Sequence, residues 1–224
     1  GEDVYSTFAT KVFNKPVSKA TPMERFVGKT CILGLGYGTG AAKLQQTLAL
    51  GNAELSLDEC KRIVDLYRTD NYRIKELWRE CDNALQQMMH EGSASVGVLE
   101  TPCNSMGIQL PNGLYIRYPS LRIGEEERII YDSRRGPVSI WGGAMVENIV
   151  QALARIIIGE QMLKIAERYK VVLTVHDAVV LCVPEEQLEE AVKYVNICMS
   201  TPPAWCKNLP VTCESKWGAS YGDC

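Results

Sequence analysis

The chain has 224 residues, 46% of them apolar, which is enough to bury one or two cores. A formal charge of −3 excludes a globally basic nucleic-acid-binding surface, so any basic surface has to be local. No apolar run is long enough to span a membrane, and no signal-peptide pattern opens the chain, so we expect a cytoplasmic protein. Nine cysteines without a C-x-x-C pair, beside only two histidines, favour reduced thiols over a zinc site.

The first part of the chain has the pattern of helices, because apolar side chains recur at helical spacing and glycine or polar residues end each run. We expect Thr21 and Glu24 to form a capping box, and Ser56 and Glu59 to form a second. A break is expected at Asn71 in the long helical stretch that follows. The expected helices cover part of residues 1–20, then 22–36, 41–50 and 56–90.

The rest of the chain mixes strands with helices. Short β-type runs surround Asn112-Gly113, a strong hairpin signal that predicts a small antiparallel unit. Helices are expected over 144–169 and 185–199, and a final strand over 209–213. Helices and antiparallel hairpins in this order indicate an α+β fold.

Arg25, Lys29, Leu33 and Tyr37 recur at every fourth position of the second expected helix and its end. Each step turns the side chain by only about 40°, so the four form one stripe. The helix start adds partial positive charge, and a triphosphate could lie along the stripe, held by Arg25 and Lys29. On spacing alone, an ordinary amphipathic helix with two exposed cations is the more frequent explanation. The neighbouring glycines follow a helix rather than a strand, so they do not predict a phosphate-binding loop.

A second group, His176-Asp177, stands between two apolar, β-branched runs within residues 170–184. The pattern predicts two buried strands joined by a tight turn, which would present the Asp177 carboxylate rigidly. Mg²⁺ prefers carboxylate oxygens, and two ions about 3.5–4 Å apart can stabilise both reacting oxygens in phosphoryl transfer. Asp is also frequent at turns without any chemistry, and that explanation stays open.

Taken together, these groups resemble the family A (Pol I-like) DNA polymerases, especially the bacteriophage type. Arg25–Gly38 matches the R-x-x-x-K…Y-G pattern of the family's fingers helix, and Val175-His176-Asp177 matches the V-H-D of its palm hairpin. Glu147–Ala152 is similar to the palm helix whose Gln reaches the primer–template minor groove, and the tail over 213–224 is similar to phage members. The resemblance covers essentially the whole chain in the family's order.

The resemblance implies a right-hand polymerase with helical fingers and part of an antiparallel-sheet palm. It implies fingers over 1–92, with the nucleotide-binding helix at 22–36, a β-hairpin region of fingers or palm over 93–143, and a palm over 144–224 with the His-Asp hairpin and the C-terminal strand. It also implies a role for single residues. Arg25 and the catalytic Lys29 would bind the phosphates of the incoming dNTP, Leu33 would lie against its sugar and base, and Tyr37 and Gly38 would contact the template. Glu147 and Gln151 would reach the minor groove, His176 would contact the primer terminus, and the catalytic Asp177 would bind two Mg²⁺ ions.

Three positions depart from the family pattern. Leu33 stands where DNA polymerases of the family have Phe or Tyr, Ala178 follows Asp177 where many have Glu, and Glu147 stands where cellular members often have Asn. A first palm motif resembling D-x-S-x-I-E, whose Asp would share both metal ions with Asp177, is not found. We therefore expect little activity from this chain alone and a requirement for an upstream segment or a separate chain.

The expected partners are a DNA primer–template, dNTPs and the segment that carries the first palm motif, without a membrane. A phage-encoded protein of this kind would act in the cytoplasm of its bacterial host. Two alternatives stay open. A single-subunit RNA polymerase fragment would share the R-x-x-x-K…Y-G helix and the H-D turn, and a non-catalytic fragment would keep the motifs for nucleic-acid binding or assembly.

Overall fold

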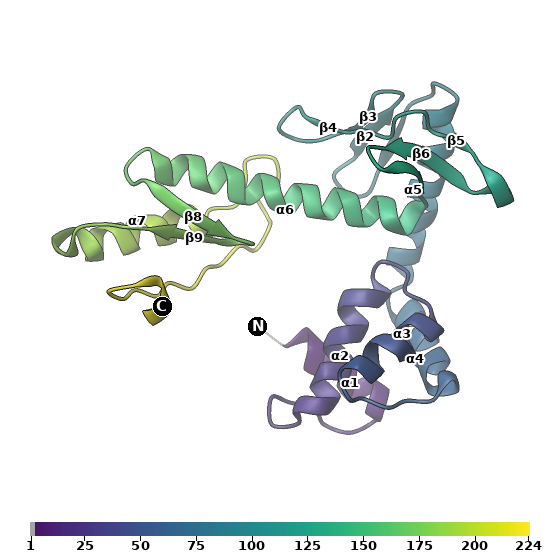
Figure 1. The fold of residues 1–224 in the computed structure, drawn as a ribbon, viewed down its shortest axis with the longest axis horizontal. Coiled ribbons are helices and arrows are strands. Elements are labelled where there is room, and N and C mark those ends of the chain that lie inside the picture. Colours follow the sequence, from purple (N-terminus) through teal and green to yellow (C-terminus); the bar gives the residue numbers. More distant parts are fainter. Residues whose placement is uncertain (1–2) are drawn as a thin grey trace. The chain divides into compact units, whose positions relative to one another are not determined.

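A computed structural model describes residues 3–224 as helices and short antiparallel strands, so the α+β class is confirmed (Figure 1). The chain divides into two compact units, one of residues 1–109 with 115–149 and one of residues 110–114 with 150–224. Which residue ranges form the fingers and which form the palm stays a prediction, because these terms name functional parts of a polymerase and the division into two compact units does not test function. Within the described residues no helix is both long and apolar enough to cross a membrane.

The helices at the start of the first unit pack around one apolar core (Figure 1). They are α1 (Val4–Phe13), α2 (Pro22–Leu35), α3 (Ala41–Leu50) and α4 (Leu57–Asp70). α2 contributes three buried side chains, Val27, Cys31 and Leu35, from one face. Gly28 lets α1 approach this face, because a Cβ atom there would lie 2.8 Å from the Cβ of Ala9.

Two helix boundaries in this unit lie where the sequence predicts them, because each depends only on neighbouring residues. The Ser56 side chain accepts a hydrogen bond from the Glu59 amide, and Glu59 accepts one from the Ser56 amide, so this capping box is confirmed. The break at Asn71 is confirmed as well, because α4 ends before it and α5 (Tyr72–Met89) begins after it.

The capping box expected at Thr21 and Glu24 is wrong. α2 begins at Pro22 as expected, but the Thr21 side chain makes no cap hydrogen bond. The preceding loop turns back, so that the Thr21 hydroxyl donates to the Ser18 carbonyl at 3.0 Å. Glu24 instead accepts a hydrogen bond from Lys15 Nζ at 2.6 Å. Loop packing therefore takes both side chains away from the helix start.

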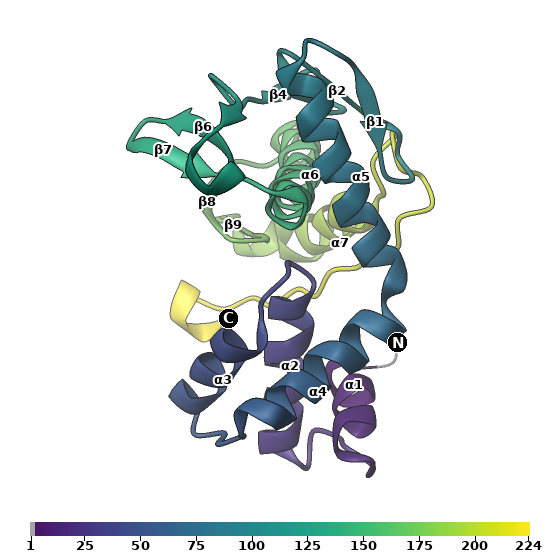
Figure 2. The same cartoon turned by 90° about the vertical axis from the view of Figure 1, so that its right-hand side faces the viewer.

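The strands of the first unit form two antiparallel sheets. One joins β1 (Ala94–Val96), β2 (Thr101–Asn104), β3 (Gly107–Gln109) and β4 (Tyr115–Ile116), and the other joins β5 (Arg122–Ile123), β6 (Ile129–Ser133) and β7 (Gly136–Ser139). The hairpin predicted at Asn112-Gly113 is confirmed, since Ile108 pairs with Ile116 and Gly113 has a φ of 81°. β1 and β2 pack against α5 (Figure 2).

The second unit contains most of α6 (Gly142–Ala166), the hairpin of β8 (Val171–Val175) and β9 (Ala178–Leu181), and α7 (Leu188–Ser200). Ile165, Cys198 and Met199 are buried at its centre, and apolar side chains of both strands pack against them. α6 begins two residues earlier than the expected 144, because the Asp82 carboxylate accepts a hydrogen bond from the Gly142 amide.

Two expectations for this unit are wrong. The segment 209–213 forms no strand; Pro210 has no amide hydrogen to donate, and β8 and β9 pair only with each other in the described sheet. β8 is not a buried strand either, since Val172 and Leu173 are each 48% exposed. Among the described residues, Val171, Val179 and Leu181 of the hairpin pack against buried side chains of α6 and α7, while Val172 and Leu173 do not reach this core.

Candidate nucleotide-binding site

The predicted stripe lies on α2 and the turn that ends it. α2 buries its Val27, Cys31 and Leu35 face, and therefore turns Lys29 and Leu33 outward; Lys29 is exposed and Leu33 is 51% exposed. Tyr37 follows in the turn, where its amide donates to the Gly34 carbonyl at 3.2 Å. The helix thus exposes Lys29 and Leu33, while Arg25 before them and Tyr37 in the turn after them are partly exposed.

Arg25 is held by the first described residues of the chain. Its Nε donates to Asp3 Oδ2 at 2.6 Å, and its guanidinium carbon lies 5.4 Å from the centre of the Tyr5 ring. The hydrogen bond from Arg25 is the largest of the effects that lower the pKa of Asp3, from 3.8 to about 2. A guanidinium has five N–H donors, so a phosphate can bind the remaining groups while Asp3 keeps Nε.

Lys29 shares with Lys19, Lys43 and Lys75 of the same unit the absence of an ion pair among the described residues, and it is the one of the four that lies on the stripe. Lys11, Lys15 and Lys61 each form an ion pair, with Asp70, Glu24 and Asp58 respectively. Among residues 3–224, no carboxylate lies within 4.0 Å of the Lys29 ammonium group. Lys29 is therefore a cation that an anionic ligand can reach without first breaking an ion pair.

The predicted two-residue turn is confirmed in the second unit. Val175 pairs with Ala178, so His176 and Asp177 occupy the turn between β8 and β9, and His176 has a φ of 53°. Both side chains are exposed. In the described part of the chain, no three His, Cys, Asp or Glu side chains gather into a metal-binding group. One exposed carboxylate does not fit a two-ion site, so the metal role of Asp177 stays a prediction.

Glu147 and Gln151, predicted for the minor groove, lie one turn apart on α6 and are exposed. Asn148 between them donates from Nδ2 to the Tyr118 hydroxyl at 3.0 Å, which anchors this stretch of α6 in the first unit. The stripe on α2 belongs to the first unit, and the His176-Asp177 turn belongs to the second. That the two groups face each other across a bound nucleotide therefore stays a prediction.

Comparison with known proteins shows what the chain is similar to. It matches no family model. It is 31% identical over 231 aligned positions to the DNA polymerase of Bacillus phage SP02, covering 94% of this chain. Nearly the whole chain is thus similar to part of a phage DNA polymerase, as the motifs predict. The chain also matches a solved structure, the POL domain of Pol1 from M. smegmatis in complex with DNA primer–template and dNTP, with a TM-score of 0.63 over 94% of this chain at 22% identity.

The chain spans about a third of each relative, 35% of the phage protein and 33% of the M. smegmatis chain. The likeness to the solved structure concerns the fold. The family resemblance drawn from the motifs is confirmed by the phage relative, which aligns with nearly the whole chain rather than with the motifs alone.

Sequence reasoning missed the residues that hold the stripe in place. Asp3 carries a local signal, because it N-caps α1 and accepts from the Tyr5 amide at 3.2 Å. Its bond to Arg25 joins residues 22 positions apart, and no local pattern encodes that contact. The same holds for Trp78, whose Nε1 donates to the Gly36 carbonyl at 3.2 Å across 42 positions.

Proposed function

We propose that this chain forms the nucleotide-binding and primer-binding part of a template-directed DNA polymerase, which transfers dNTPs to a primer 3′-hydroxyl. The observation that carries the proposal is the exposed, unpaired Lys29 in the middle of the α2 stripe, one turn after Arg25 and one turn before Leu33. About two turns of helix, at a rise of about 1.5 Å per residue, place Arg25, Lys29 and Leu33 along about 12 Å, a length that suits an extended triphosphate.

In this proposal Arg25 and Lys29 bind the phosphates, and Leu33 lies against the sugar and base. Lys29 stabilises the negative charge that develops at the reacting phosphate and can donate a proton to the leaving pyrophosphate. Tyr37 stacks at the template position, and Gly38 allows the chain to turn beside it. His176 contacts the primer terminus, while Glu147 and Gln151 reach the minor groove.

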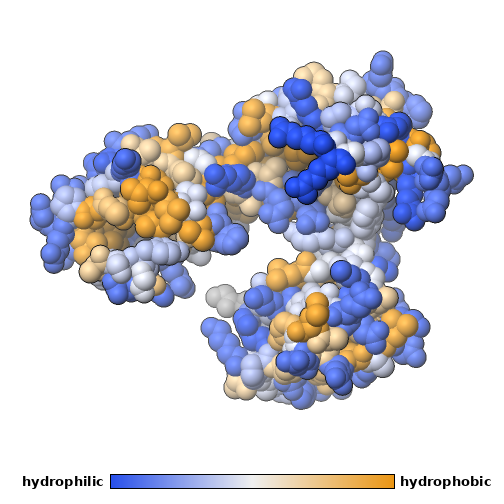
Figure 3. All heavy atoms as spheres, in the orientation of Figure 1, coloured by the Kyte–Doolittle hydropathy of each residue, from blue (hydrophilic) through white to orange (hydrophobic). Residues whose placement is uncertain are grey.

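We further propose that the complete polymerase uses two Mg²⁺ ions and that Asp177 supplies one carboxylate. The remaining carboxylate would come from another segment, either upstream in the same polypeptide or on a separate chain. Two observations support such a partner. The chain spans only 35% of its phage relative, and the second unit exposes apolar side chains around β8. Figure 3 shows this apolar surface beside the strands labelled β8 and β9 in Figure 1.

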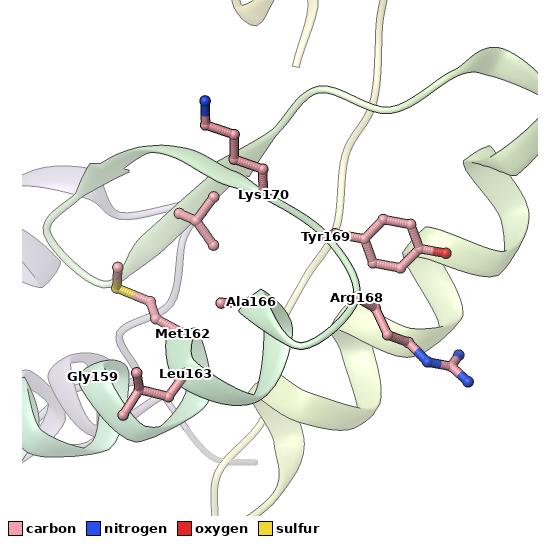
Figure 4. Close-up of a pocket in the computed structure, with 8 residues that line it drawn as sticks. Gly159, Met162, Leu163, Ala166, Arg168, Tyr169 and Lys170 are labelled. Carbon is pink, nitrogen blue, oxygen red and sulfur yellow. The ribbon is translucent and has the colours of Figure 1, made fainter.

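A hollow of about 480 Å³ in the second unit adds to this surface. It is lined by the end of α6 and the start of β8, with Met162, Leu163 and Ala166 on the helix side (Figure 4). Leu163 is 72% exposed, so the hollow presents mainly apolar surface to whatever covers it. Burial of apolar surface is favourable by about 25 cal/mol per Å², so a protein segment that covers the hollow would bind with a hydrophobic contribution.

Primer extension by the complete polymerase, meaning this chain with its upstream segment in cis or as a second chain, tests the function. We expect Lys29→Ala to lower kcat by about 10²–10³, the range for a group that stabilises transition-state charge. Lys61→Ala is the matched control, because Lys61 is exposed and already paired with Asp58. Equal activity of the Lys29 and Lys61 variants would refute the assignment.

Two further measurements separate the alternatives. Preference for NTPs over dNTPs would favour a single-subunit RNA polymerase. Unchanged synthesis in Asp177→Ala would favour a non-catalytic fragment. Robust Mg²⁺-dependent synthesis by this chain alone would overturn the proposed need for an upstream segment.

The proposal also includes a location. A replicative enzyme of a phage acts in the cytoplasm of its bacterial host, where the phage DNA is copied.

A further inference from the structure

The turn that carries Tyr37 is packed against a tryptophan from the other end of the first unit. The six-membered ring of Trp141 lies between Gly38 and Gly143, and a Cβ atom at either glycine would overlap the ring atoms Cη2 and Cζ2. Gly38 has a φ of 83°, a conformation that glycine adopts readily and other residues rarely adopt. Two glycines separated by more than a hundred residues in sequence thus form the two sides of one slot for an indole ring.

The slot is braced by α5. The rings of Trp78 and Trp141 meet edge to face, with centroids 5.6 Å apart and planes at 68°. Trp78 is 8% exposed, and its Nε1 donates to the Gly36 carbonyl at 3.2 Å. One turn later on α5, Asp82 accepts from the Gly142 amide. α5 therefore holds both the end of α2 and the start of α6, with the Trp141 ring between them.

We infer that Trp141 is a positioning residue for Tyr37 and thereby determines which base pairs the polymerase accepts. The inference rests on the proposed function, in which Tyr37 stacks at the template position. Without the Trp141 ring, the turn keeps its backbone hydrogen bonds, of Tyr37 to Gly34, of Gly38 to Leu35 and of Thr39 to Gly34, and the bond from Trp78 to the Gly36 carbonyl, but it loses the ring that packs against Gly38. A flexible glycine beside the stacking ring would then let Tyr37 move, and the site would accept misaligned bases.

Trp141 suits a direct test because it is 40% exposed, so its removal opens a space to solvent rather than a closed cavity. The variants are Trp141→Ala, Trp141→Phe and, as a matched control, Trp217→Ala, whose ring is 59% exposed. kcat and KM for correct and mismatched dNTPs are measured in the complete polymerase. We expect Trp141→Ala to raise KM for the correct dNTP and to lower the ratio of kcat/KM for correct over mismatched dNTPs, each about tenfold. Trp141→Phe should recover most of both losses.

The ratio separates positioning from a purely structural role. Partial unfolding lowers the concentration of active enzyme and scales kcat equally for every nucleotide, so it leaves the ratio unchanged. An unchanged ratio in Trp141→Ala, or the same change in Trp217→Ala, overturns the inference.

A second measurement does not depend on activity. Hydrogen exchange in this chain should be faster at the Tyr37–Thr39 amides in Trp141→Ala and close to wild type in the other two variants. Equal protection of these amides in all variants also overturns the inference. Failure of the wild-type complete polymerase to extend any primer would refute the proposed function instead, and the exchange result would still decide whether Trp141 holds the turn.

Discussion

Gly28→Ala is the change whose consequence follows most directly from the packing of the candidate site. Gly28 lies on α2 between Arg25 and Lys29 and faces α1. An added Cβ would lie 2.8 Å from Ala9 Cβ and would overlap the carbonyl oxygen of Tyr5. The overlap is with the backbone, which cannot escape by a side-chain rotation, so α1 has to shift away from α2.

The magnitude comes from two opposing effects. Alanine in a helix interior is about 1 kcal/mol more favourable than glycine. Overpacking a tight contact costs about 1–3 kcal/mol. Because the overlapped atom is backbone, we place the cost in the upper part of this range and expect a net loss of about 1–2 kcal/mol in the free energy of unfolding. The shift of α1 should also pull Asp3 away from Arg25 and raise KM for dNTPs.

Gly159→Ala is the matched control. Gly159 also lies inside a helix, α6, but a Cβ atom there would meet no other atom within 4 Å. Only the propensity gain applies, and we expect a stabilisation of about 1 kcal/mol. Urea unfolding followed by circular dichroism measures both variants. Gly28→Ala as stable as Gly159→Ala would refute the reasoning, because it would mean that α1 and α2 leave room for a methyl group.

Three more predictions follow from single contacts. Hydrogen bonds, first from Arg25 and then from Ser6, lower the pKa of Asp3 from 3.8 to about 2. The contribution of Asp3 to stability is therefore present above pH about 4 and is lost as the pH falls toward 2. Asp3→Asn should flatten the acid limb of a stability–pH curve, and an unchanged limb would contradict these bonds. Ser56→Ala should cost about 1 kcal/mol in urea unfolding by removing the α4 cap, and a neutral result would contradict that cap. Asp177→Asn should abolish primer extension with unchanged thermal unfolding, because the side chain is exposed, whereas Asp58→Asn should keep full activity.

Features that depend on a few neighbouring residues could be predicted. The Ser56–Glu59 cap, the break at Asn71 and the His176-Asp177 turn all appear where local patterns place them. The failures share another cause. Thr21 was expected to cap α2, but a loop contact with Ser18 takes its hydroxyl. Residues 209–213 have strand-like composition, but a strand needs a partner, and the described sheet offers none.

The sequence by itself determined the order of helices and hairpins, the stripe of Arg25, Lys29, Leu33 and Tyr37, and the resemblance to phage DNA polymerases, because these depend on spacing and residue type along the chain. The tertiary structure alone decided what holds that stripe: Asp3 and Tyr5 beside Arg25, and Trp141 against the turn after α2. The most distant of these contacts joins Gly38 and Trp141, which are 103 positions apart, and such contacts form only because burial of apolar helix faces brings those segments together.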